Sequence, residues 1–292
     1  AGLVDRPDHV QRLFGITCEL VVEDALAPGQ RIFERNQLAF VAGELLGHET
    51  GLGEEALHLA RALGGAYGIA FVEAEVGMAL LGHGGNSTVA RGHLEEALRL
   101  AHSLDADWLP MLALISLATV AEVEGQHEQA GALWQEALLL AEAMGDRAFA
   151  AYIRLGLAQL AVIAGDQDEA AAHCRKALLL AQEMGSAAAA APCLAGIAGL
   201  LSAQQRCEPA VRLLAASDRL REAVEQHPLH GPQFQAAFTP ALSATQATMS
   251  PEAFAEAWAA SLALSLDQAT DLALAELASP PPATNPVNAA VS

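Results

Sequence analysis

The sequence is poor in positive charge and contains a single lysine, Lys176. Fifteen lysine and arginine residues stand against 35 aspartate and glutamate residues, which gives a formal net charge of −20 at pH 7. A surface of this sign repels the phosphates of nucleic acids, so we expect no direct binding to DNA or RNA. The acidic excess is typical of a chain that must stay in solution although 53% of its residues are hydrophobic.

The sequence also lacks the motifs that carry catalysis or hold a cofactor. It contains no GxxxxGK[ST] phosphate loop and no HExxH zinc motif. The glycine-rich GHGGNS at 82–87 is better explained as a turn between helices. The HPLH segment at 227–230 resembles a metal-ligand pair, and Asp105 with Asp107 resembles a carboxylate pair, but we interpret them as a solvated turn and as helix caps. We therefore predict no enzyme activity, no cofactor and no metal site.

Cysteines are few, and no CxxC motif pairs them. We expect buried thiols in a reducing cytoplasm. The four are Cys18, Cys174, Cys193 and Cys207. No signal-peptide pattern opens the chain, which begins with alanine, and we expect an excised fragment or a processed chain. The uncharged stretch at 186–205 is rich in alanine and contains Pro192, so it favours a buried helix over a membrane span.

What the sequence does contain is a repeat. The stretch ALLLAEAMGD at 137–146 returns as ALLLAQEMGS at 177–186, and weaker copies start at Ala97 and Ala56. The copies are 41, 40 and 40 residues apart. A period of this length is typical of helical arrays in which no unit can bury its own apolar face. We predict an all-α fold, a right-handed superhelical solenoid of antiparallel helix pairs.

Apolar residues at helical spacing, separated by short turns that contain glycine, define the expected helices. The N-terminal part predicts helices at 8–25, 32–46 and 54–63. The clearer repeats predict helices at about 67–83, 88–104, 108–124, 127–144, 147–164, 167–184, 187–204 and 207–226. We expect 1–278 to form one helical-repeat domain, clearest at 67–226 and closed by capping helices at 231–278. The segment SPPPATNPVNAAVS at 279–292 predicts an extended linker.

Small residues recur at fixed positions of the repeat. Gly77, Ala118 and Ala158 each stand seven residues before a turn glycine, and the next helix carries two alanines that flank a bulkier residue. Those flanked sets are Ala130, Trp134 and Ala137, and then Ala170, Cys174 and Ala177. The pattern resembles the tetratricopeptide repeat, whose small residues let two helices approach closely. The tryptophan and tyrosine usual in its first helix are missing, and the period is 40 rather than 34 residues, as in the longer repeats of signalling ATPases and large LuxR-type transcriptional regulators.

The C-terminal part extends this resemblance. AVRLLAASDRLREAV at 210–224 and FAEAWAASLALSLDQATDLALAEL at 254–277 resemble the end of the sensor region in LuxR-type ATPase regulators. The matching positions are Ala255, Trp258, Leu264, Ser265, Leu266 and Ala269, while Ser261 stands where that family usually has glycine. Ser265 with Gln268 also predicts a helix capping box. The resemblance implies a cytoplasmic, non-catalytic sensor region that restrains an ATPase and responds to an inducer or a protein partner. Alternatives are a free-standing tetratricopeptide adaptor and a helical enzyme whose active residues are not recognised.

The tetratricopeptide register also implies which side chains would face a binding groove, namely those on the first helix of each pair. They are Phe71, Met78 and Leu81, then Leu112, Ile115, Thr119 and Glu122, then Tyr152, Leu155 and Gln159. Because the set is largely apolar, it would suit a protein or peptide partner, an apolar inducer or a second copy of the chain, but not nucleic acid or a membrane. Apolar helical stripes are more often core, so burial of the same residues is the alternative.

Overall fold

The computed structural model describes residues 50–63, 65–82, 86–104, 108–222 and 232–279. Within these ranges the regular structure is helical, without strands, and within each unit helices pack as neighbouring pairs. The prediction of an all-α array of helix pairs is confirmed. The predicted helices at 8–25 and 32–46, Asp105, Asp107, the HPLH segment and the linker beyond Ser279 lie outside the described residues. The chain divides into two compact units, Ala1–Asp146 and Arg147–Ser292.

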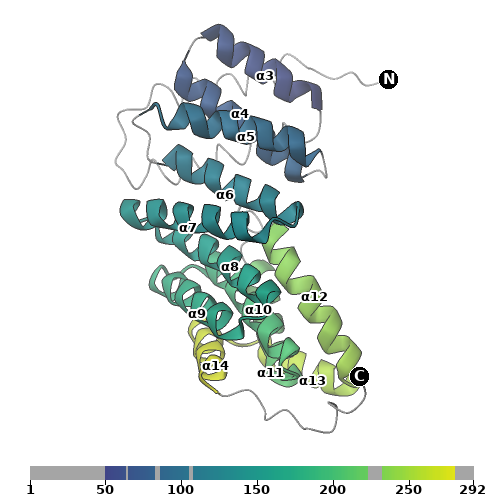
Figure 1. The fold of residues 1–292 in the computed structure, drawn as a ribbon. Coiled ribbons are helices and arrows are strands. Elements are labelled where there is room, and N and C mark those ends of the chain that lie inside the picture. Colours follow the sequence, from purple (N-terminus) through teal and green to yellow (C-terminus); the bar gives the residue numbers. More distant parts are fainter. Residues whose placement is uncertain (1–49, 64, 83–85, 105–107, 223–231, 280–292) are drawn as a thin grey trace. The chain divides into compact units, whose positions relative to one another are not determined.

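The first unit is a run of antiparallel neighbours (Figure 1). α3 packs on α4, α4 pairs with α5, and α6 pairs with α7, while α5 and α6 join the two pairs. The helices span Thr50–Leu63 (α3), Ala66–Gly82 (α4), Ser87–Ala101 (α5), Trp108–Val123 (α6) and His127–Met144 (α7). The predicted ends of α4 to α7 lie within three residues of these bounds, and glycine-containing turns mark most of them, whereas the connection between α5 and α6 contains no glycine.

The second unit continues the pairing and then changes it (Figure 1). α8 pairs with α9 and α10 pairs with α11, whereas α12 lies on α10 and α11, and α14 contacts α9, α10 and α11. The helices span Arg147–Ala164 (α8), Gln167–Glu183 (α9), Ala187–Ala203 (α10), Cys207–Glu222 (α11), Pro232–Thr248 (α12), Pro251–Ser261 (α13) and Leu266–Ala278 (α14). The last three helices therefore close the array from the side of α10 and α11.

Turns repeat every twenty residues and fix the helix ends. Glycines at 125, 145, 165 and 185 take positive φ angles between 59° and 80°, the left-handed conformation that ends a helix. Gln205 occupies the next position of this series with φ 61°, although a side chain disfavours that conformation. Asp166 and Ser186 then cap the following helices by accepting hydrogen bonds from backbone N–H groups at 2.9 and 3.2 Å.

Small residues let the paired helices approach, as the repeat pattern predicts. Ala130, Ala137, Ala170 and Ala177 are all fully buried. Trp134 and Cys174, between those alanines, are buried as well, and Trp134 Nε1 donates a hydrogen bond to Glu122 at 2.7 Å. The closest approach is at Gly77 in α4, where an added Cβ would lie 2.5 Å from Leu94 Cγ in α5.

The uncharged stretch at 186–205 forms α10, which is a core helix as predicted. Twelve of its residues are buried against α9, α11 and α12, and hydrophobic residues occur all round it. By length and composition alone, one described helix, α8, could cross a membrane. Since α8 packs along α9 and 44% of its apolar window is buried, a core helix of a repeat array accounts for the same composition.

Two arginines attach the C-terminal helices to the array. Arg206 is mostly buried, donates to the Glu276 backbone carbonyl at 2.9 Å and forms an ion pair with the Glu276 carboxylate. Arg219 of α11 donates to the Leu264 backbone carbonyl between α13 and α14. The predicted capping box is present, because Ser265 accepts from Gln268 N–H and Gln268 accepts from Ser265 N–H. Ser261, at the position where the resemblance implies a glycine, is fully buried and donates to the Ala257 carbonyl.

Candidate functional site

A hollow of about 470 Å³ lies in the second unit, between α8, α10 and α12. This volume is in the range of small-molecule sites, which are usually apolar clefts with a few polar groups. We call it the α8–α10–α12 hollow. Its lining comes from one face of each of these helices, together with Cys174 of α9 and Gln205 of the turn after α10.

α8 supplies the wall with most of the large apolar side chains. Leu155, Ala158, Gln159, Val162 and Ile163 follow one another at spacings of 3, 1, 3 and 1 residues, the helical pattern that places them on one face. Val162 and Ile163 are 46% and 52% exposed and are adjacent in the lining. This wall therefore presents bare apolar surface at the edge of the hollow.

α10 presents two glycines, Gly196 and Gly199, to the hollow, so part of its wall has no side chains. Gly199 lines the hollow, and an added Cβ there would meet nothing within 4 Å. Gly196, one turn earlier, would place a Cβ 3.7 Å from Cys174 Sγ and 3.8 Å from Leu155 Cδ2, an ordinary contact distance. Side chains at these two positions would therefore take space from the hollow without striking the backbone.

α12 supplies the third wall with small and rigid residues, Pro240, Ala241 and Ala244. Pro240 lies inside the helix, as Pro192 does in α10, and both prolines line the hollow. A proline within a helix leaves the carbonyl four residues earlier without its usual donor. The sequence predicts a capping helix in this region but not its place beside α8 and α10.

The lining has no charged side chain. Its polar side chains are Gln159 and Gln205, which are exposed, and the buried Ser202. Burial raises the pKa of the Cys174 thiol to about 12, so this sulfur stays protonated at neutral pH and is a weak nucleophile. The arrangement is suited to binding uncharged apolar groups rather than to covalent or acid–base chemistry.

The predicted groove residues do not share one environment. In the first unit Phe71, Leu112 and Ile115 are only 3%, 8% and 5% exposed, so they are core residues and form no bare strip. The reason is that apolar residues occur on every side of α4 and α6, and the two glutamates of α4, Glu73 and Glu75, are themselves buried, so neither helix has a distinct polar face to turn outward. This is the alternative that the sequence leaves open, and for these three positions it replaces the groove prediction.

The other predicted residues are more accessible. Met78, Leu81, Thr119, Glu122 and Tyr152 are half-buried. Thr119 donates to the Ile115 carbonyl, and burial raises the pKa of Glu122 although Trp134 donates to its carboxylate. Leu155 and Gln159, both of α8, line the α8–α10–α12 hollow. Sequence reasoning misses Val162 and Ile163 on the same face, although both follow Gln159 at helical spacing.

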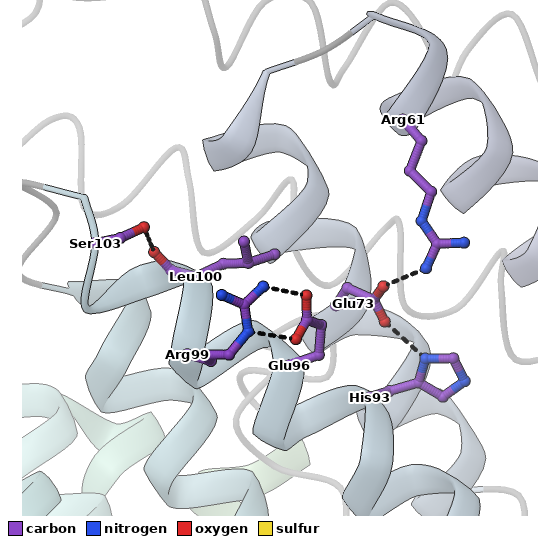
Figure 2. A network of polar contacts seen from close by, with 7 residues as sticks. All are labelled: Arg61, Glu73, His93, Glu96, Arg99, Leu100 and Ser103. Carbon is purple, nitrogen blue, oxygen red and sulfur yellow. Dashed lines mark hydrogen bonds and ion pairs between the residues drawn. The ribbon is translucent and has the colours of Figure 1, made fainter.

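A polar cluster in the first unit connects three helices (Figure 2). The buried Glu73 of α4 accepts from Arg61 Nη2 of α3 at 2.8 Å and lies 2.7 Å from His93 Nδ1 of α5. Glu75, two residues on, is 1% exposed, and neither carboxylate oxygen has a hydrogen-bond partner among the described residues. Burial raises the pKa of Glu75 well above its usual range. The cluster stabilises helix packing and opens onto no described cavity.

A second, more open depression lies where α12 and α13 meet α11. Phe238, Phe254 and Trp258 contribute aromatic rings, with Phe254 and Trp258 stacked at 5.6 Å. Asp218 at its edge is paired with Arg221 at 2.9 Å. In the described part of the chain, no group of three or more His, Cys, Asp or Glu side chains is arranged to hold a metal ion.

Comparison with known proteins supports the fold. No protein-family model matches the sequence, and no curated protein does. Among solved structures, 31 chains match, including the crystal structure of BtubC (BKLC) from P. vanneervenii. That alignment has a TM-score of 0.55 and 16% sequence identity, and covers 82% of this chain and 95% of BtubC. The likeness shows a shared fold. At this identity it says nothing further about function.

Proposed function

We propose that this chain is a non-catalytic sensor and protein-interaction region of a bacterial LuxR-type transcriptional regulator, which works in the cytoplasm. A helical-repeat fold supports the interaction role at the coarse level, because such arrays present extended surfaces for partners. The regulator role is supported by the α11, α13 and α14 segments, whose residues resemble the end of the sensor region in that family. No nucleic-acid binding is assigned to this chain, whose net charge is −20.

The observation that carries the proposal is the α8–α10–α12 hollow. It contains two of the positions at which the tetratricopeptide register predicts binding, Leu155 and Gln159. Its lining includes α8 and α10, which belong to the regular helix pairs, and α12, which packs on α10 and α11 instead of forming a pair of its own. A molecule bound there would touch both and could alter how α12 lies on α10. Such coupling is what a sensor region requires, since an effector acts only through its different affinity for two states.

The genomic sequence on both sides of the coding region tests the regulator role. The proposal predicts, in the same reading frame, an ATPase with a GxxxxGK[ST] motif upstream and a helix-turn-helix downstream. Stop and start codons directly flanking these residues would instead favour a free-standing adaptor. Turnover of a substrate by the purified chain, lost when a hollow residue is changed, would contradict the non-catalytic role.

A further inference from the structure

We infer that the α8–α10–α12 hollow binds a small, uncharged and mostly apolar molecule that carries one hydrogen-bonding end. The inference rests on the proposed function and names the chemical class of the effector. An uncharged amphiphile with a ring system or a medium-length chain, ending in a hydroxyl, carbonyl or amide, has this chemistry. The volume of about 470 Å³ is in the range usual for sites of drug-sized ligands.

The charge of the ligand follows from the lining. Of the residues that line the hollow none is charged, although the whole chain has 50 acidic and basic residues, 35 and 15 respectively. A carboxylate, phosphate or ammonium group would lose water here without meeting a counter-charge, which is strongly unfavourable. The thiol of Cys174 adds no charge at neutral pH.

The apolar part of the ligand has a defined place. Val162 and Ile163 leave about half of their surface bare beside the hollow, and contact with a ligand would remove that surface from water. Gly199 of α10 also lines the hollow, and the side chain it lacks leaves open space there. Glycine inside a helix is less favourable than alanine. Gly199 therefore lowers helix stability but leaves room for a ligand in the hollow.

The polar end of the ligand has two partners at the edge. Gln159 and Gln205 both line the hollow, and each side-chain amide can donate and accept hydrogen bonds. Both are exposed, so a bound hydroxyl or carbonyl would lie at the entrance while the apolar part lies against Leu155 and Ile163. A few polar groups that fix orientation in an apolar cleft are the usual design of such sites.

A pair of matched fluorescent probes tests whether the ligand of the hollow is apolar and whether it must be uncharged. N-phenyl-1-naphthylamine is uncharged, and 1-anilinonaphthalene-8-sulfonate has the same rings with an added sulfonate. Fluorescence titration of the full chain should show one site for the uncharged probe, with a Kd of about 10 μM or lower. The anionic probe should bind at least about tenfold more weakly. Equal binding of the two probes would overturn the assignment of an uncharged ligand.

Variants locate the site. Gly199→Phe fills the hollow from α10 and should weaken binding of the uncharged probe at least about tenfold. Gly92→Phe is the matched control, because an added Cβ at this exposed glycine of α5 also meets nothing within 4 Å. Gly92 belongs to the first unit, whereas every residue that lines the hollow belongs to the second. If Gly199→Phe does not fold by circular dichroism, Ala244→Phe fills the hollow from the exposed face of α12 and decides the question.

The outcomes separate this inference from the proposed function. Unchanged binding in a folded Gly199→Phe or Ala244→Phe protein would place the probe elsewhere and overturn the inference. Binding that appears only after removal of residues 280–292 would make this uncharged tail the occupant and would overturn it as well. Neither result alters the reading-frame test of the regulator role, which fails only if no ATPase and no helix-turn-helix are encoded beside the chain.

Discussion

Replacing Gly77 with alanine should show how closely α4 and α5 are packed. Alanine in a helix interior is more favourable than glycine by about 1 kcal/mol, so helix propensity alone predicts a more stable protein. The structure predicts the reverse. The new Cβ would lie 2.5 Å from Leu94 Cγ, 2.8 Å from Leu94 Cδ2 and 3.1 Å from the Ala90 carbonyl oxygen. Leu94 is fully buried, so its side chain cannot swing into solvent.

The size of the effect follows from a comparison with Gly92→Ala. Gly92 lies within α5 of the same unit, and its added Cβ meets nothing within 4 Å. Both variants gain about the same helix propensity, so this term cancels in the difference between them. What remains is the overpacking at Leu94, which costs about 1–3 kcal/mol. We expect Gly92→Ala to be stabilised by about 1 kcal/mol, and Gly77→Ala to range from unchanged to about 2 kcal/mol less stable.

Urea unfolding followed by tryptophan fluorescence measures this difference. Trp108 and Trp134 both belong to the first unit, where Trp108 lies 6.0 Å from Phe71 and Trp134 is fully buried. The third tryptophan, Trp258, lies in the second unit, so it is replaced by phenylalanine in all the proteins compared, and the remaining signal reports the unit that contains both variants. Equal stabilisation by Gly77→Ala and Gly92→Ala would mean that α4 and α5 are not in close contact, and the helix-pair register would be wrong.

Two further changes test single features. Glu75→Gln should stabilise the chain by about 1–3 kcal/mol near pH 8 and have little effect near pH 4. The raised pKa of Glu75 means that the folded state keeps a proton that the unfolded state releases, so wild-type stability falls as the pH rises above the usual glutamate pKa. A difference in urea midpoint between wild type and Glu75→Gln that does not change with pH would contradict this. Arg206→Lys should cost about 1–3 kcal/mol, because lysine cannot hold both the Glu276 carbonyl and its carboxylate. An unchanged melting temperature for Arg206→Lys would show that this contact does not hold α14 in place.

The sequence predicts the regular part of the fold well, because the physical causes are local. Turns every twenty residues, such as Gly145 and Gly165, end helices in the left-handed conformation, and Asp166 begins the next one. The small residues Ala130 and Ala170 mark the contacts between paired helices, and both are fully buried. These signals depend only on neighbours within one repeat, so spacing alone predicts them.

The candidate site is harder to predict, because it depends on a helix outside the repeat. α12 contains Pro240 and has no counterpart in the forty-residue pattern, so its place beside α8 and α10 follows from tertiary packing alone. The groove prediction fails at Phe71 for another reason. Apolar residues occur on every side of α4, so its sequence cannot distinguish a face that meets α5 from one that would meet a ligand. Leu155 and Gln159 line the hollow, and α8 has a more one-sided distribution of apolar residues than α4.

A methyl NMR titration with N-phenyl-1-naphthylamine tests most directly whether the α8–α10–α12 hollow is a binding site. Val162 and Ile163 line the hollow, whereas Val123, forty residues before Ile163, is 69% exposed and lines no described cavity. Leu139 is a second exposed apolar control, at 67%. The account predicts saturable shifts for the methyl groups of Val162 and Ile163, with those of Val123 and Leu139 unchanged. Equal shifts at all four residues, or none at Val162 and Ile163, would contradict it.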